Sequence, residues 1–229
     1  MIGGPLLYFL RPRLPITRAS NTRARPLDFR FLLQKTFLIY ETGNILEAMG
    51  YFLPTIYLPS YARALGASGI EASLTVIVFN LASVFGCVIM GSMVDRYHAT
   101  TCILASTVGS TIAVFLIWGF STSLAPLYIF CIFYGLFAGS FTSTWPAVVH
   151  EVKKRSVTAD SSIIFGLLST GRGIGNIVSG PLSEALLEHH AWDGVVGKAY
   201  GSGYGPLIVF TGVSCFLGGL GVAARSLVR

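Results

Sequence analysis

The sequence predicts an all-α membrane protein with six transmembrane helices. Of its 229 residues, 53% are hydrophobic and only 11% are charged, whereas a soluble domain carries about 25% charged residues. This deficit of charge indicates that most of the chain is solvated by lipid. Because lipid offers no hydrogen bonds to exposed backbone groups, the apolar segments are expected to be helices.

Six apolar runs have the length of a membrane-spanning helix, which needs about 17 to 25 residues. They cover approximately residues 36–57, 72–90, 100–119, 124–149, 163–187 and 206–224. Residues 1–35 are basic and rich in proline, and we interpret them as a cytoplasmic arm. Residues 36–229 then form a six-helix transmembrane domain.

The positive charges are distributed unevenly between the connections. Of the 16 Lys and Arg residues, 13 fall on the side that holds both ends of the chain, two fall on the other side, and Arg172 lies inside a run. This asymmetry follows the positive-inside rule and places both termini in the cytoplasm. It also explains the net charge of +6 without a nucleic-acid partner. The membrane of residence is expected to be the plasma membrane, with an internal membrane as the alternative.

Charged residues inside the apolar runs are confined to the first and the fifth. The fifth contains "LLSTGRGIGNIVSGP", with Arg172 near its centre, and the first carries Glu41, Asn44 and Glu47. An arginine in the middle of a membrane helix costs about 2.5–3.5 kcal/mol on an insertion scale. Such a residue therefore needs a partner or a water-filled cavity.

Helical spacing aligns these polar residues into two stripes. Steps of three and four residues join Tyr40, Asn44, Glu47 and Tyr51 on the first helix, and Ser169, Arg172, Asn176, Ser179 and Ser183 on the fifth. One interpretation is that the stripes form the wall of an aqueous path in which Arg172 pairs with Glu47. The other is a buried ion pair that only holds the bundle together. A six-helix bundle alone is expected to leave both stripes open.

Enzymatic and metal chemistry find no support in the sequence. The glycines around Arg172 do not have dinucleotide-binding spacing, and His150–Glu151 lacks the spacing of a zinc helix. The four cysteines have no CxxC pattern and are interpreted as small packing residues. We therefore expect no enzyme activity, no metal and no cofactor.

Four stretches resemble one transporter family. "GSMVDRYH" resembles the loop motif of the major facilitator superfamily, with Gly91, Asp95 and Arg96 matching it. "GNILEAMGYFLPTIYLPSYARALG" and "GRGIGNIVSGPLSEALL" are similar to the first and fifth helices of the C-terminal half of monocarboxylate-porter-like transporters, especially the fungal-type branch. "GPLLYFLRPRLP" is similar to the end of the sixth helix and the central loop of that branch.

The resemblance implies the C-terminal six-helix half of a twelve-helix secondary transporter for small organic solutes, with monocarboxylate-like anions among the expected substrates. It also implies that the third and sixth helices of the half lie outside the substrate cavity. The Asp and Arg pair that animal monocarboxylate carriers hold on the second helix is missing here, and Asn80 is the only comparable polar group of that helix. Arg172 would then bind the anionic group and Glu47 would be its counter-ion or a protonatable site. The other residues expected to shape the pocket are Asn44, Asn176, Tyr51 and Tyr134.

Since half of a substrate cavity comes from the other six helices of such a carrier, this domain is expected to form a homodimer or to join a second half-transporter. The alternative is a truncated product that transports nothing and acts as a regulatory or assembly partner of a full-length carrier.

Overall fold

The computed structural model describes residues 29–156, 158–188, 192, 194 and 197–219, and all regular structure within this part of the chain is helical. The predicted arm at residues 1–28 and the end of the sixth run, from residue 220, lie outside the described residues. The longer helices are α2 (Lys35–Ala64), α3 (Gly69–Arg96), α4 (Ala99–Ile112), α5 (Leu124–Phe137), α6 (Trp145–Arg155), α7 (Ser161–Glu188) and α8 (Gly205–Gly218). Short helical turns are η1 (Arg30–Leu33), η2 (Ala113–Trp118), η3 (Phe141–Thr144) and η4 (Lys198–Gly201).

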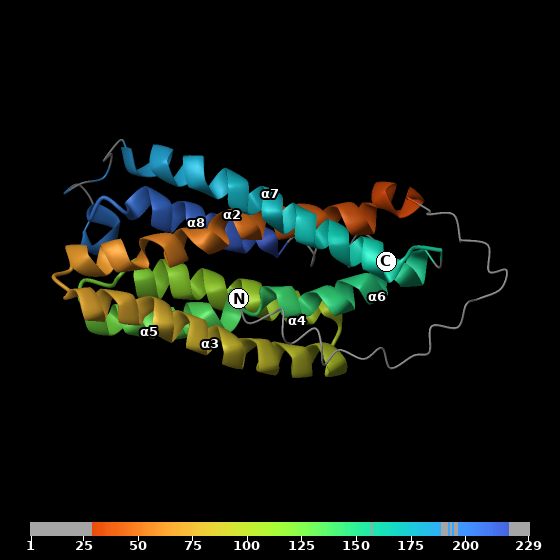
Figure 1. Cartoon of the computed structure of the whole chain (residues 1–229), viewed down its shortest axis with the longest axis horizontal. Coiled ribbons are helices and arrows are strands. Elements are labelled where there is room, and N and C mark those ends of the chain that lie inside the picture. Colours follow the sequence, from red (N-terminus) through yellow and green to blue (C-terminus); the bar gives the residue numbers. More distant parts are fainter. Residues whose placement is uncertain (1–28, 157, 189–191, 193, 195–196, 220–229) are drawn as a thin grey trace, which may run out of the picture.

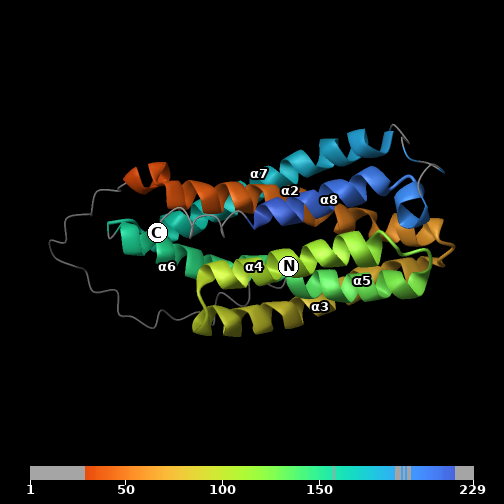
Figure 2. The same ribbon diagram turned by 180° about the vertical axis from the view of Figure 1, so that it is seen from behind.

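The helices run roughly parallel to the long axis of an elongated bundle (Figure 1). Helix α2 packs extensively against α7 and α8, and α3 packs against α5. The two sides of the bundle, α2 with α7 and α8 and α3 with α4 and α5, remain distinct when it is viewed from behind (Figure 2). Contacts of α2 with α3 and of α4 with α8 join the two sides.

Three helical segments are long and apolar enough to cross a membrane by length and composition: Gly69–Arg96, Ala99–Trp118 and Leu124–Arg155. Helices α2 and α7 have 30 and 28 residues, but their polar and small residues lower their hydropathy. Helix α8 is apolar and shorter. The all-helical fold thus agrees with the sequence analysis, and the count of six spans stays a prediction.

The fourth run, expected to be one helix over 124–149, is divided into α5, η3 and α6. Hydroxyl groups explain the break, because they compete for backbone carbonyls. Ser140 Oγ donates to Leu136 O at 2.7 Å, and Thr144 Oγ1 donates to Phe141 O at 2.7 Å. Pro146 then lies in the first turn of α6, where its missing N–H costs nothing.

The "GSMVDRYH" stretch is not a loop as the resemblance implied. Gly91, Asp95 and Arg96 belong to the last turns of α3, and only Tyr97 and His98 separate α3 from α4. His98 makes this tight connection possible, because its Nδ1 accepts the Thr100 N–H and caps α4. Among the described residues, Asp95 and Arg96 are exposed and have no salt-bridge partner.

Buried apolar residues form two clusters at different levels of the bundle. One is centred on Tyr61, Trp118, Phe130 and Tyr134, and the other contains Tyr40, Trp145, Ile164 and Leu168. Helix α2 contributes to the second cluster as far as Tyr40 and to the first from Leu53 onward. The segment between them holds Glu41, Asn44 and Glu47, so the polar residues of α2 lie between two hydrophobic layers.

Candidate functional site

Helices α2 and α7 come very close beside this polar segment because α7 has glycine there. A Cβ atom built on Gly175 would lie 2.6 Å from Ala48 Cβ and 2.8 Å from Ile45 O, and one built on Gly171 would overlap the Glu41 carboxylate. Small residues at such positions let membrane helices approach one another closely. The approach brings the middle of α7 against the middle of α2.

A salt bridge joins the two helices at this level. Arg172 Nη1 donates a hydrogen bond to Glu47 Oε2 at 2.7 Å, with side chains 12% and 4% exposed. Each residue lies far from both ends of its helix, Glu47 in Lys35–Ala64 and Arg172 in Ser161–Glu188. In a membrane the pair would therefore lie near the midplane, where its charges are poorly solvated and strongly coupled.

The pair leaves bonding capacity unused. Within the described residues, Glu47 Oε1 is buried without a hydrogen-bond partner, and the guanidinium makes the single hydrogen bond to Oε2. A planar guanidinium can hold a carboxylate with two parallel hydrogen bonds. Part of the Arg172 fork is thus available to a second acceptor.

Aromatic rings border the guanidinium. Arg172 Cζ lies 4.5 Å from the centre of the Tyr51 ring and 5.7 Å from that of Phe52. Cation–π contact of this kind stabilises a desolvated cation. Tyr134 on α5 is fully buried and stacks with Tyr51, with the two ring centres 6.4 Å apart. Tyr51 thus contacts both the Tyr134 ring and the Arg172 guanidinium.

The two asparagines differ in their surroundings. Asn44 Nδ2 donates to Leu168 O at 2.7 Å, a bond that ties α2 to α7. Asn176 is half-buried and follows Arg172 by one turn of α7. In both residues the side-chain oxygen is buried without a partner in the described part of the chain, so each retains one free acceptor.

The prediction that a six-helix bundle leaves the polar stripe of the first helix open is wrong, because residues of this stripe are buried. Tyr40, Asn44 and Glu47 are 6%, 1% and 3% exposed, because α7 packs directly over them. On α7, Ser169 is exposed, whereas Ser179 and Ser183 are buried, and Ser183 Oγ lies 3.0 Å from Tyr57 Oη on α2. The two stripes therefore face each other for much of their length, and Arg172 keeps a small exposed fraction.

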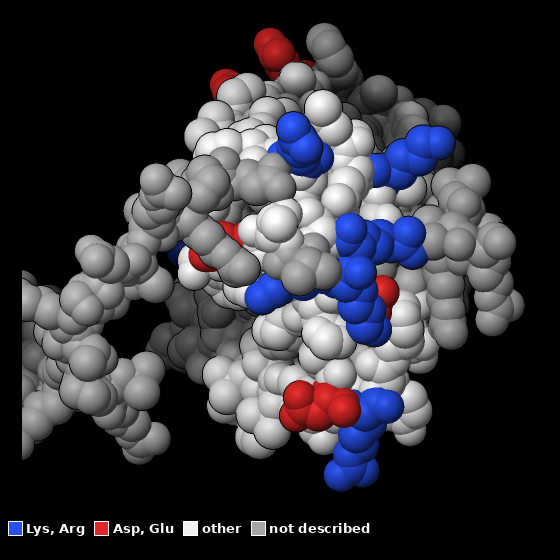
Figure 3. All heavy atoms as spheres, turned by 90° about the vertical axis from the view of Figure 1, so that its right-hand side faces the viewer, with Lys and Arg blue, Asp and Glu red and all other residues white. Residues whose placement is uncertain are grey.

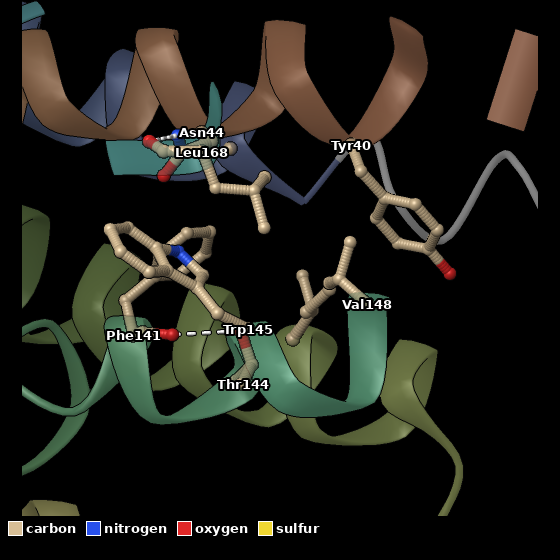
Figure 4. Close-up of a pocket in the computed structure, with 9 residues that line it drawn as sticks. Tyr40, Asn44, Phe141, Thr144, Trp145, Val148 and Leu168 are labelled. Atoms are coloured by element: carbon tan, nitrogen blue, oxygen red, sulfur yellow. Dashed lines mark hydrogen bonds between the residues drawn. The ribbon is translucent and has the colours of Figure 1, made fainter. Parts of the chain in front are cut away.

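A small cavity lies toward the α6 end of the bundle, beside Asn44 (Figure 4). Its volume is about 10 Å³, and Tyr40, Asn44 and Leu168 face Trp145 and Val148 across it. Such a volume accommodates about one water molecule. An organic solute cannot bind inside it.

Two features were missed by sequence reasoning. Glu41 is half-buried against Gly171 on α7, and its Oε2 has no partner among the described residues. His98 Nε2 lies 3.2 Å from Glu151 Oε1 and so links the α3–α4 connection to α6. Neither contact has a local sequence signal, because the partners are far apart in the chain.

Apolar helices with a charged pair buried between hydrophobic layers fit an integral membrane protein. The family model of the Major Facilitator Superfamily matches residues 42–227. The chain belongs to this family, whose members are transporters and not enzymes.

Curated relatives agree with the family. The chain is 29% identical over 202 residues to the MFS-type transporter pynF of Aspergillus niger, covering 86% of this chain and 44% of the relative. It is 24% identical over 231 residues to MFS-type transporter 1 of an Ophiocordyceps species, covering 96% and 47%. It is also 24% identical over 177 residues to human monocarboxylate transporter 7, covering 75% and 33%. The chain thus spans less than half the length of these relatives.

Proposed function

We propose that this chain supplies one half of the substrate path of a secondary transporter for small organic anions, with monocarboxylate-like anions as the first class to test. The observation that carries the proposal is the Arg172–Glu47 pair, buried between helices at mid-depth and only partly hydrogen-bonded. The name of monocarboxylate transporter 7 supports this choice of substrate class.

In this proposal Arg172 holds Glu47 while the site is empty and exchanges it for the carboxylate of the substrate. Arginine suits the role because it stays charged when poorly solvated and offers a fork of donors. Glu47 acts as the alternating counter-ion or takes up a proton. Tyr51 borders the guanidinium and Tyr134 packs against Tyr51. The free side-chain oxygens of Asn44 and Asn176 would accept a hydrogen bond from a donor group of the substrate and not from its carboxylate.

The 10 Å³ cavity is too small for a solute, so the substrate would bind between this half and a second one. We propose that the second half comes from the remainder of the same protein, from a separate chain or from a second copy. Gly91, Asp95 and Arg96 would take part in the conformational change at the end of α3. Both termini would be cytoplasmic, with the plasma membrane as the first location to examine.

Uptake and efflux of labelled organic anions, cations and neutral solutes by cells expressing the complete carrier test the proposal. The parent is expected to move an anion class. An Arg172→Lys variant should lose this transport, and an Arg63→Lys variant at the end of α2 should retain it. Transport restricted to neutral or cationic solutes, or unaffected by Arg172→Lys, would contradict the proposal.

A second candidate function is a non-transporting assembly partner of a full-length carrier. The cavity beside Asn44, at about 10 Å³, is too small for an organic solute, as expected of a chain that does not transport by itself. Expression of this chain alone and together with a full-length carrier, followed by transport and co-purification, separates the two. Activity of the chain alone would exclude the partner role.

A further inference from the structure

An open groove lies between α6 and α7 at the end of the bundle opposite Arg63. Its volume is about 470 Å³, and it is lined by Pro146, Val149, His150, Lys153, Lys154 and Ser161. Figure 3 shows that Lys and Arg side chains gather over this end of the molecule. The groove is separate from the Arg172–Glu47 site.

The charges around the groove are unevenly compensated. Lys154 Nζ lies 2.8 Å from Glu151 Oε1, the same oxygen that contacts His98. Lys153 Nζ instead donates to the neutral Ser161 Oγ at 3.0 Å, across the gap between the helices. Among the described residues Lys153 therefore has no acidic partner. Asp160, at the start of α7, accepts the Ser162 N–H.

The wall of the groove changes character with depth. His150, Lys153 and Lys154 belong to the last turns of α6, and Pro146 lies one turn before His150, about 6 Å farther along the helix axis. Since Leu124–Arg155 is apolar and long enough to cross a membrane, its basic end lies at the membrane surface and the part lined by Pro146 and Val149 lies deeper. A cationic rim above an apolar floor matches a lipid headgroup above its acyl chains.

We propose that this groove binds an anionic phospholipid, with the headgroup phosphate on Lys153, Lys154 and His150 and the first acyl methylenes on Pro146 and Val149. Basic pockets between transmembrane helices recognise anionic headgroups in this way. A small free anion would have no use for the apolar floor. Bound lipid would stabilise the packing of α6 against α7, because the groove is lined by Lys153 of α6 and by Ser161 of α7.

The test uses the purified full chain in mild detergent. Phosphatidylserine, phosphatidylcholine and the chain-free headgroup glycerophosphoserine are titrated separately, and binding is followed by native mass spectrometry and by the melting temperature. Phosphatidylserine is expected to bind saturably and raise the melting temperature, and the other two are not. Replacing Lys153→Gln and Lys154→Gln together should weaken phosphatidylserine binding roughly 30-fold.

The matched control is Arg63→Gln with Arg155→Gln, which removes two exposed positive charges outside the groove and should leave binding unchanged. Equal weakening in the control would show diffuse attraction and overturn the proposal. So would equal binding of phosphatidylcholine, which indicates general lipid solvation, or of glycerophosphoserine, which indicates a site for small anions. Should the double lysine variant lose its helical fold, Lys153→Gln alone, expected to weaken binding roughly fivefold, replaces it.

Discussion

Arg172 on α7 and Glu47 on α2 form a 2.7 Å salt bridge although 125 positions separate them in the sequence. Both lie between the two hydrophobic clusters of the bundle, and each is central in a long helix. The pair is therefore the polar layer of an otherwise apolar interior. Its unused hydrogen-bonding capacity suits it to exchange partners, which a saturated structural pair does less readily.

Arg172→Lys is expected to fold and reach the membrane in the complete carrier, yet to lose at least about tenfold of its anion transport. Lysine keeps a positive charge near Glu47, but it lacks the planar fork and can lose its proton when poorly solvated. Transport normalised to membrane abundance measures the effect. Parental transport by this variant would contradict the proposed role of Arg172.

Glu47→Gln is expected to retain more abundance than Glu47→Leu and to flatten the dependence of transport on pH. The Gln side chain still offers Arg172 an oxygen acceptor, but it cannot take up a proton. Transport rates in mildly acidic and neutral media, for the parent and the variant, provide the measurement. A parental pH profile would assign the protonation step to another group, with Glu41 as the first candidate.

Gly175→Ala is expected to destabilise the bundle, whereas Gly180→Ala on the same helix is not. A Cβ at Gly175 meets Ala48 Cβ and the backbone of Ile45, and one at Gly180 meets nothing within 4 Å. Overpacking of a tight interface costs about 1–3 kcal/mol, and alanine in an open helix position is favourable by up to about 1 kcal/mol. The melting temperatures of the parent and of both variants are measured in the same detergent. An equal change in melting temperature for the two variants would argue against the close contact between α2 and α7.

His98→Ala is expected to lower the free energy of unfolding by about 1 kcal/mol through loss of the α4 cap. Loss of the contact between His98 and Glu151 should lower it by a smaller additional amount. His98→Asn should recover most of the capping contribution, because asparagine caps helices well, but not the link to α6. Thermal unfolding of the two variants separates the contributions. Identical melting temperatures for them would indicate that the cap contributes little.

The sequence was sufficient to predict an all-α membrane protein of this family, and the spacing of polar residues placed Glu47 and Arg172 on stripes that could meet. It did not predict the break between α5 and α6, because hydropathy does not record whether a hydroxyl group bonds to a backbone carbonyl of its own helix. It also did not predict that α7 covers Asn44 and Glu47. That depends on how closely two distant helices approach at Gly175, which a one-dimensional pattern does not contain.

The most direct test of the central claim is a double-mutant comparison at the Arg172–Glu47 pair in the complete carrier. Membrane abundance and anion transport are measured for Arg172→Leu, Glu47→Leu and the two together. Each single variant leaves an unpaired charge and should lose abundance, which the double variant should recover because it buries no charge. We predict that the double variant recovers abundance and remains inactive; recovery of both abundance and transport would show that the pair is scaffolding and does not bind substrate.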